Sequence, residues 1–240
     1  MNFQKKYTGQ DILIIGGGTS TLDTQWENIV TPSTYIWTCN DFYMNDRVLD
    51  SKIDLYQLAY TTKLSDNDKL INKLKKDKPL TYYEPDHYRR KENSKEFKTF
   101  EKNIEAAIPG MHIDLGTIKD TPASKSGAVF RLILLASTTK ARNIYFVGFD
   151  GFNKDFSNCH AFTGHRGLKK SDTRRDYDGN NPLSYVNIFT EAYRYLASLE
   201  NKNILQNLGE GLDYNIGSRV SKKYFPLRDE IKNKLYETIR

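Results

Sequence analysis

The sequence has only two cysteines, Cys39 and Cys159, which are too few for a disulfide framework and do not have the spacing of metal ligands. We therefore expect a reducing, cytoplasmic environment in which both thiols are small core residues. No apolar run reaches the roughly 18 residues of a membrane helix. No apolar stretch like that of a secretory signal follows the N-terminal residues, and internal repeats and low-complexity segments are absent as well.

The composition is typical of a globular protein. Hydrophobic residues make up 38% of the 240 residues and charged residues 28%, and the 16 Tyr and 12 Phe supply much of the material for a core. A chain of this length can bury a sizeable core. We expect a single domain over residues 1–240, with lid or insertion loops at 63–105 and 151–180.

The most informative segment is residues 11–20, where the apolar run Ile-Leu-Ile-Ile leads directly into Gly-Gly-Gly-Thr-Ser. A buried strand that turns into a glycine loop lets the backbone approach a ligand and offers N–H groups to a phosphate or a ribose. The spacing differs from the dinucleotide fingerprint G-x-G-x-x-G, and the lysine of a Walker loop is missing. The segment indicates nucleotide binding; the alternative is a tight strand-to-helix turn without a ligand.

Strand and helix patterns alternate along the chain. We expect strands at residues 12–15, 35–38, 53–58, 143–148 and 204–208. Helices are expected from residue 19 or 20 through Trp26, from about residue 126, from Asn181-Pro182, and over 226–239. Residues 63–105 are charged and rich in tyrosine, and we interpret them as a lid or helical insertion outside the core. The alternation predicts an α/β fold, a Rossmann-like parallel sheet with helices on both faces.

Polar segments follow three of these strands, and ligands of parallel sheets bind outside the carboxyl ends of the strands. Asn40 and Asp41 could hydrogen-bond a base edge or sugar hydroxyls. Ser126 and Gly127 open a helix whose N-terminus favours a phosphate. Asp150 either holds a ribose or bonds its own backbone in a turn.

The net charge is +6 and is unevenly distributed. Residues 63–102 contain twelve Lys or Arg against eight Asp or Glu, and residues 166–175 contain five against one. Residues 219–240 add a further basic cluster. Such segments favour a polyanion, whether nucleic acid, a phosphorylated glycan, a membrane surface or a nucleotide. The alternative is a solvated surface that is rich in lysine.

In their order and approximate spacing, these segments resemble the bacterial sialyltransferases that modify lipooligosaccharide. That family has G-N-G-P-S after the first strand, R-C-N-Q-F-Y after the second, T-S-G at a later helix start and S-G-I-D-F-Y after the next strand. The corresponding segments here are residues 16–20, 38–43, 125–127 and 147–152, and the resemblance extends over most of residues 10–210. It implies a glycosyltransferase with a Rossmann-like, GT-A-type variant fold that is independent of metal and cofactor and uses a nucleotide sugar as donor.

Together with the polar strand ends, the resemblance indicates a nucleotide-sugar site. Its expected residues are Gly16, Gly17, Gly18, Thr19, Ser20, Asn40, Asp41, Lys125, Ser126, Gly127, Asp150 and Phe152.

The chain also departs from this family. Gly17 replaces an asparagine that holds the ribose, Asp41 replaces a glutamine, and Phe152 replaces a phosphate-binding tyrosine. A second such tyrosine, in Y-A-F, corresponds to His160, which could donate to the leaving phosphate. Asn180 stands where H-Y-I-G-H has the catalytic histidine. We therefore expect a donor other than CMP-sialic acid and a different base.

Glycosyl transfer needs a base for the acceptor hydroxyl, stabilisation of the leaving phosphate, and exclusion of water. Asp178 is the first candidate for the base and His165 the second. His160, Lys125 and the helix start at Ser126 are candidates for stabilising the leaving group. No Asp-x-Asp element follows a strand, and the one at residues 66–68 is interpreted as a helix cap or solvated loop, so no metal is expected.

The acceptor is either a surface glycan or a nucleic acid such as hydroxymethylated viral DNA. The basic residues expected to contact a polyanionic acceptor are Arg89, Arg90, Lys91, Lys169, Arg174 and Arg175. Two other classes of function fit the sequence. One is a nucleotide- or pterin-binding phosphotransferase on a similar fold, and the other is a non-catalytic nucleic-acid-binding protein, which would leave the polar strand ends unexplained.

Overall fold

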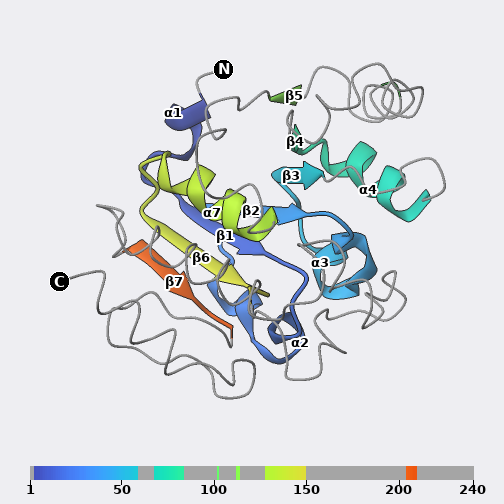
Figure 1. Ribbon diagram of the computed structural model, residues 1–240, viewed down its shortest axis with the longest axis horizontal. Helices are drawn as coiled ribbons and strands as arrows, with labels where there is room; N and C mark the ends of the chain where they lie inside the picture. The colour runs from blue at the N-terminus through green and yellow to red at the C-terminus, as the bar shows by residue number, and fades with distance from the viewer. Residues whose placement is uncertain are drawn as a thin grey trace, which may run out of the picture.

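The computed structural model describes residues 3–58, 68–83, 102, 112–113, 128–149 and 204–209, which form a seven-stranded sheet (Figure 1). The strands lie in the order β5-β4-β3-β2-β1-β6-β7, and every pairing is parallel. Their bounds are β1 Asp11–Ile15, β2 Thr34–Cys39, β3 Leu55–Leu58, β4 Leu80–Tyr83, β5 His112–Ile113, β6 Asn143–Val147 and β7 Leu205–Asn207. The α/β class predicted from the alternation of patterns is confirmed.

The strand order has a reversal beside β1. From β1 the chain adds β2, β3, β4 and β5 in one direction, and β6 then pairs with the other side of β1. β1 is therefore central, and all five of its residues are buried, as expected for a continuous apolar run in a parallel sheet. Such a reversal is the place where parallel sheets bind ligands, because the connections on its two sides leave toward opposite faces.

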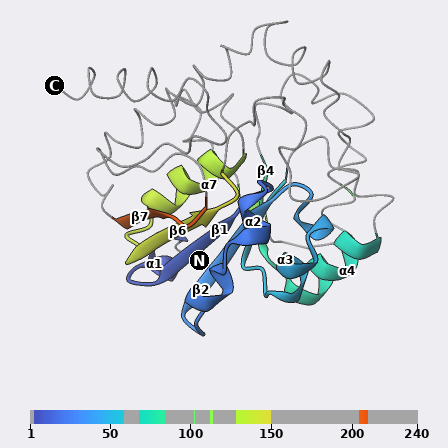
Figure 2. The ribbon, with the colours of Figure 1, turned by 90° about the horizontal axis from the view of Figure 1, so that it is seen from below.

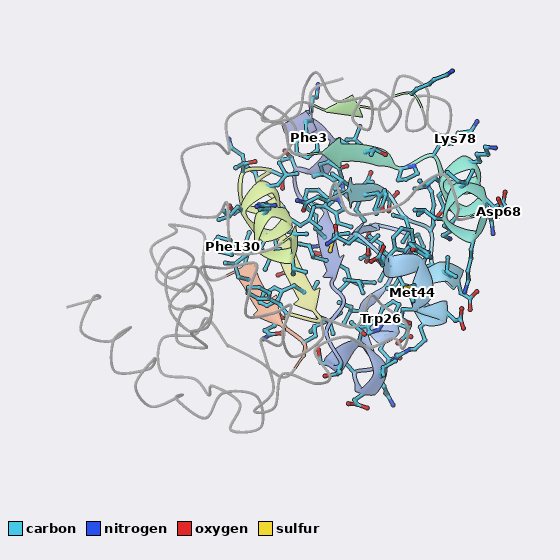
Figure 3. The ribbon with its side chains drawn as sticks, turned by 45° about the vertical axis from the view of Figure 1, so that its right-hand side comes forward. Phe3, Trp26, Met44, Asp68, Lys78 and Phe130 are labelled. Atoms are coloured by element: carbon cyan, nitrogen blue, oxygen red, sulfur yellow. The ribbon has the colours of Figure 1, made fainter. Side chains whose placement is uncertain are left out.

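Helices cover both faces of the sheet (Figure 2). On one face α7, Ala128–Ser137, packs against β1, β2 and β6. The helix α1, Phe3–Tyr7, contributes to the same core. On the other face lie α3, Asp46–Asp50, and α4, Asp68–Asp77, with the short helices η1, Trp26–Ile29, and η2, Phe42–Met44. Phe130 of α7 and Trp26 mark these two cores on opposite sides of the strands (Figure 3).

α7 runs from the carboxyl edge of the sheet to its amino edge. A Cβ atom on Gly16, just after β1, would lie 2.6 Å from the Val129 side chain in the first turn of α7. At the other end of this helix, Gly9 N–H, before β1, donates to the carbonyl of Lys140 at 3.0 Å. The N-terminus of α7 therefore lies beside the glycine loop, as the sequence predicts.

Most of the expected elements in the described part of the chain are confirmed. The strands predicted at 12–15, 35–38, 53–58, 143–148 and 204–208 correspond to β1, β2, β3, β6 and β7, and the helix predicted near residue 126 is α7. Cys39 is buried in the core, as expected. The helices predicted at 181 and at 226–239, the loop at 151–180 and Cys159 lie outside the described residues.

The helix predicted to run from residue 19 or 20 through Trp26 is wrong in its length. α2 spans only Ser20–Asp23, and Trp26 begins η1 instead. The helix ends because the backbone turns extended at Thr24, with φ of −81° and ψ of 138°. The carbonyls of Thr21, Leu22 and Thr24 accept hydrogen bonds from the Arg47 guanidinium. Thr19, one of the two residues at which the sequence predicts this helix to begin, is its N-cap and makes no side-chain capping bond.

The interpretation of residues 63–105 as an insertion outside the core is wrong for residues 68–83. α4 buries Leu70 and Leu74, one turn apart, against the sheet, and β4 pairs with β3 and β5 as a strand of that sheet. The surrounding lysines conceal this pair of leucines in the sequence. The lid interpretation stays a prediction for the rest of that segment.

No helix among the described residues is both long enough and apolar enough to cross a membrane.

Candidate functional site

The carboxyl ends of β1, β2 and β6 lie side by side. Ile15, the last residue of β1, is in register with Thr38 of β2 on one side and Val147 of β6 on the other. The glycine loop that begins at Gly16, the Asn40–Asp41 pair after β2 and Gly148 after β6 therefore line one edge of the sheet. This edge includes the reversal of strand order, so the candidate site lies where a parallel sheet binds its ligand.

The glycine loop after β1 and the segment after β6 are in direct backbone contact through Gly16 and Gly148. Gly16 N–H donates to the carbonyl of Val147 at 2.8 Å, and Gly18 N–H donates to the carbonyl of Gly148 at 3.1 Å. A Cβ on Gly16 would lie 2.5 Å from the Gly148 carbonyl oxygen, a distance that no side chain tolerates. Glycine is therefore required at residue 16 to close the loop on the end of β6.

The loop has inner and outer residues. Gly16, Gly18 and Ser20 are buried, whereas Gly17 and Thr19 are partly exposed. The Ser20 hydroxyl accepts a hydrogen bond from Gly148 N–H at 3.0 Å, so it fastens the loop to the end of β6. Of the five predicted residues, Gly17 and Thr19 are the two whose partly exposed positions suit contact with a ligand.

Asn40 adopts a left-handed backbone conformation, with φ of 49°, at the end of β2. Asparagine tolerates this region better than most residues do. Hydrogen bonds to both backbone groups of Asn40 fix this conformation. Asn40 N–H donates to the Gln57 carbonyl at 2.9 Å, and the Tyr56 hydroxyl donates to the Asn40 carbonyl at 2.8 Å. Asn40 thus holds one defined backbone geometry at the predicted site, and its side chain is partly exposed.

Asp41 places a negative charge beside Cys39. Burial raises the pKa of the Cys39 thiol to about 12, and the Asp41 charge acts in the same direction. The thiol is therefore protonated and unsuited to nucleophilic chemistry, which agrees with its expected role as a small core residue. The Asp41 carboxylate accepts a hydrogen bond from the Tyr43 hydroxyl at 3.3 Å.

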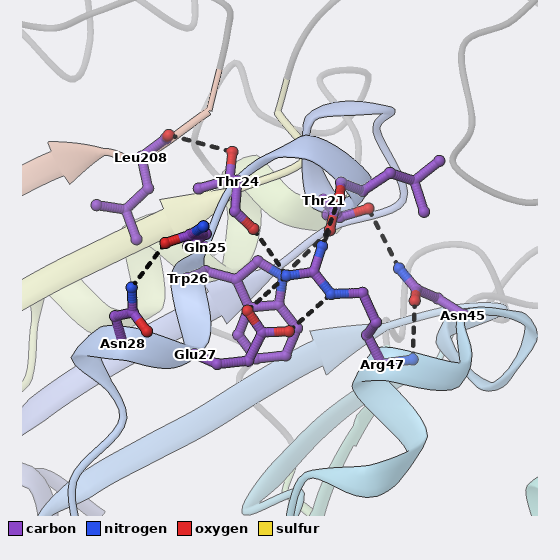
Figure 4. Close-up of polar contacts among 10 residues, drawn as sticks. Thr21, Thr24, Gln25, Trp26, Glu27, Asn28, Asn45, Arg47 and Leu208 are labelled. Atoms are coloured by element: carbon purple, nitrogen blue, oxygen red, sulfur yellow. Dashed lines mark hydrogen bonds and ion pairs between the residues drawn. The ribbon is translucent and has the colours of Figure 1, made fainter.

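Arg47 supports the segment after the glycine loop, and no pattern in the sequence indicates this role. Its guanidinium donates to the carbonyls of Thr21, Leu22 and Thr24 at 2.6, 2.7 and 2.8 Å (Figure 4). It also pairs with the Glu27 carboxylate and lies 5.3 Å from the centre of the Trp26 ring. The planar five-donor fork of arginine suits this pattern, and lysine could not reproduce it.

A second set of contacts connects the same loop to α3. The Thr21 hydroxyl donates to the Gly18 carbonyl at 2.8 Å and accepts from the Asn45 side-chain amide at 3.2 Å. Asn45 also caps α3, since its side-chain oxygen accepts from Arg47 N–H. The Gly18 carbonyl of the loop is therefore held by Thr21, which Asn45 holds in turn, and these contacts preorganise the loop.

Gln57 is a further residue that sequence reasoning missed. It lies next to Cys39 in the sheet, one residue before the end of β3, and is 2% exposed. Its Oε1 atom has no hydrogen-bond partner within the described part of the chain. A polar residue at the carboxyl end of a buried strand is the signal that could have identified it.

The other predicted site residues lie outside the described residues. Of the donor-site predictions these are Lys125, Ser126, Gly127, Asp150 and Phe152. The same holds for the candidate catalytic residues Asp178, His165 and His160, and for the acceptor-binding candidates Arg89, Arg90, Lys91, Lys169, Arg174 and Arg175. Over the ranges that the structure describes, no three His, Cys, Asp or Glu side chains are grouped so that they could hold a metal ion.

The architecture is that of an α/β protein with a Rossmann-like parallel sheet and a candidate site at the carboxyl edge. Solved structures with a similar fold are bacterial sialyltransferases. A single-residue variant of the sialyltransferase CstII in complex with CMP shares 17% identity and a TM-score of 0.53, with 96% of this chain and 100% of that chain covered. Another variant of this α-2,3/8-sialyltransferase gives 16% identity and a TM-score of 0.51, with 94% and 99% covered.

CstII comes from Campylobacter jejuni. At these identities the likeness shows the fold alone, and it confirms the resemblance in fold that the sequence motifs indicated. No protein-family model matches the sequence, and no curated protein matches it.

Proposed function

We propose that the protein is a glycosyltransferase that binds a nucleotide sugar at the carboxyl edge of its sheet. The observation that carries this proposal is the contact between Gly16 and Gly148, which brings the glycine loop to the reversal of strand order. Phosphates bind at such positions because backbone N–H groups and a helix N-terminus favour negative charge. The first turn of α7 supplies that N-terminus, beside Gly16.

The fold likeness supports the choice of donor class. The similar structure of CstII, a sialyltransferase, is a complex with the nucleotide CMP. The same order of polar segments in this chain supports a nucleotide at the corresponding edge. The departures at Gly17 and Asp41 favour a sugar nucleotide other than CMP-sialic acid.

The chemical step in this proposal is a metal-independent transfer to an acceptor hydroxyl. Asp178, with His165 as the second candidate, takes the proton of that hydroxyl, and His160 with Lys125 stabilises the leaving phosphate. A polyanionic acceptor is favoured by the basic character of residues 63–102, to which the exposed lysines Lys69, Lys75 and Lys76 of α4 belong.

A thermal-shift screen against CMP, UDP, GDP and their sugar conjugates tests the proposal. A ligand that binds only the native state raises the melting temperature, by an amount that grows with its concentration relative to Kd. The best ligand should lose its effect in Gly17→Val, which adds bulk at a partly exposed position of the loop. Ser33→Val, at an exposed residue before β2 on the opposite edge, is the matched control. No shift with any nucleotide would contradict the proposal.

A further inference from the structure

The side chain of Gln57 has a buried acceptor for which the described part of the chain supplies no donor. The residue is 2% exposed, and its Oε1 atom has no hydrogen-bond partner there. A buried amide oxygen that has lost its water and gained no donor destabilises the fold. Buried groups of this kind are rare in native proteins, and a ligand that supplies the missing donor is one of the few explanations.

The position of Gln57 relates this acceptor to the proposed donor site. Side chains alternate between the faces of a strand, so Gln57 shares a face with Leu55, which packs in the core beneath α7. Its register partner Cys39 belongs to the same core. Gln57 N–H and C=O lie beside the end of β2, where its carbonyl accepts from Asn40 N–H. The unpartnered oxygen is therefore two strands from the glycine loop, on the face that α7 covers.

A second acceptor lies near Cys39, the register partner of Gln57. Asp41, two residues after Cys39, is close enough for its carboxylate charge to act on the thiol. The ends of β2 and β3 thus present an amide oxygen and a carboxylate, both of which accept hydrogen bonds. A group that carries its own carboxylate would be repelled there, whereas a group with several hydroxyls would be bound.

We propose that Gln57 determines donor specificity, and that it accepts a hydrogen bond from a hydroxyl of a neutral sugar. This inference rests on the proposed function, since it assumes a nucleotide whose phosphates lie at the glycine loop and whose sugar extends over β2 and β3. It disfavours an acidic sugar, because the Asp41 charge repels a carboxylate and the Gln57 Oε1 atom can only accept a hydrogen bond. A site built to bind a hydroxyl discriminates strongly, since its buried acceptor is left unpaired by the wrong ligand.

Calorimetric titration of the full-length protein with UDP-glucose, GDP-mannose and CMP-N-acetylneuraminate, and with UDP, GDP and CMP alone, provides the test. The wild type should bind one neutral conjugate more tightly than the acidic one. Gln57→Met, which keeps the length of the side chain and removes its acceptor, should weaken that conjugate about tenfold and the free nucleotide by less than about twofold. Gln206→Met, at an exposed glutamine of β7, should change neither.

Stability separates a ligand contact from a structural role. Replacing an unpartnered buried acceptor by an apolar group of similar shape should leave the melting temperature of the ligand-free protein unchanged or higher. If Gln57→Met does not fold, Gln57→Asn withdraws the oxygen by one methylene and should give the same selective loss.

Three results would overturn the inference while leaving the proposed function intact. They are an unchanged affinity in both variants, an equal loss for the conjugate and the free nucleotide, and a wild-type preference for CMP-N-acetylneuraminate. If the wild type binds none of the six ligands, the proposed function fails and the inference fails with it.

Discussion

Lys73 and Asp77 form a buried ion pair one turn apart in α4, with 2.9 Å between Nζ and Oδ2 and side chains only 6% and 5% exposed. Both groups have further partners. Lys73 Nζ donates to the carbonyl of Ser51 at 2.6 Å, and Ile53 N–H donates to the Asp77 carboxylate at 2.8 Å. The pair therefore joins α4 to the segment that leads into β3, and it explains how a lysine-rich helix becomes part of the core.

Lys73→Met should destabilise the protein by about 3–5 kcal/mol, because it leaves the Asp77 charge buried without its cation. Lys69→Met is the matched control in the same helix. Lys69 pairs with Asp46 at 2.6 Å, but both side chains are exposed, and such surface pairs contribute about 0–1 kcal/mol. Urea unfolding of the two variants measures the difference. Equal losses would show that the buried pair has no special role in the fold.

Gly148→Ala should destabilise the protein more than Gly9→Ala does, although both glycines have a positive φ, +75° and +71°. The left-handed conformation costs each variant about 1–2 kcal/mol. Only at Gly148 would the new Cβ also meet neighbours, at 2.7 Å from the Thr21 side chain and 2.9 Å from the Gly16 backbone, whereas nothing lies within 4 Å at Gly9. The additional cost of overpacking is about 1–3 kcal/mol. Chemical denaturation curves of the two variants check the order.

Asp11 and Asp54 should make the free energy of unfolding depend on pH in opposite directions. Arg142 donates to the Asp11 carboxylate at 3.0 and 2.6 Å and holds the pKa of Asp11 below its usual value. This contribution is present above the unfolded pKa of about 3.9 and is lost as the pH falls through the folded pKa. Burial raises the pKa of Asp54 in the folded protein. Its ionisation therefore destabilises the native state, and this loss of stability grows as the pH rises from the unfolded pKa of about 3.9 to the folded pKa.

Asparagine variants isolate these two effects. Asp11→Asn should lower the melting temperature at pH 7 and reduce its fall toward pH 3. Asp54→Asn keeps an oxygen for the Ile36 N–H, which donates to the wild-type carboxylate at 2.9 Å, and should leave the melting temperature at pH 7 unchanged or higher. Melting curves from pH 3 to pH 7 would contradict this assignment if both variants changed in the same direction.

The sheet could be predicted largely from the sequence, because β1, β2 and β6 are short, mostly apolar runs that a glycine or a polar residue follows. The glycine loop and Asn40 were identifiable in the same way. Arg47, by contrast, binds carbonyls that precede it by 23 to 26 residues, and no local pattern encodes such a pairing. Gln57 is similar, since its importance lies in a missing partner that only the packed structure shows.

Asp178→Asn should lower the rate of sugar transfer by about two to four orders of magnitude with little change in donor affinity, which is the usual contribution of a general base. The substitution keeps the shape of the side chain and removes its ability to take a proton. Single-turnover rates and donor binding, measured on the same preparation, give the two quantities. If activity survives in this variant and collapses in His165→Ala, the histidine is the base.

The acceptor class should be visible in the dependence of binding on salt. If the acceptor is DNA, the basic residues of 63–102 and 166–175 contact phosphates, and affinity falls steeply as the salt concentration rises, because bound counterions are released. Replacing Arg89, Arg90 and Lys91 by alanine should then weaken binding to all sequences alike and reduce the slope by about one for each phosphate that these side chains neutralise.

A matched control for this test replaces Lys5, Lys52 and Lys140, three lysines outside the two basic segments, by alanine. This variant has the same net charge as the test variant, so a loss confined to Arg89, Arg90 and Lys91 reports direct binding and not total charge. A neutral glycan acceptor predicts little salt dependence and no difference between the two triple variants. Binding to a duplex with hydroxymethylated bases, measured at two salt concentrations, decides between the acceptors, because no detectable binding at the lower concentration would exclude DNA and favour the glycan.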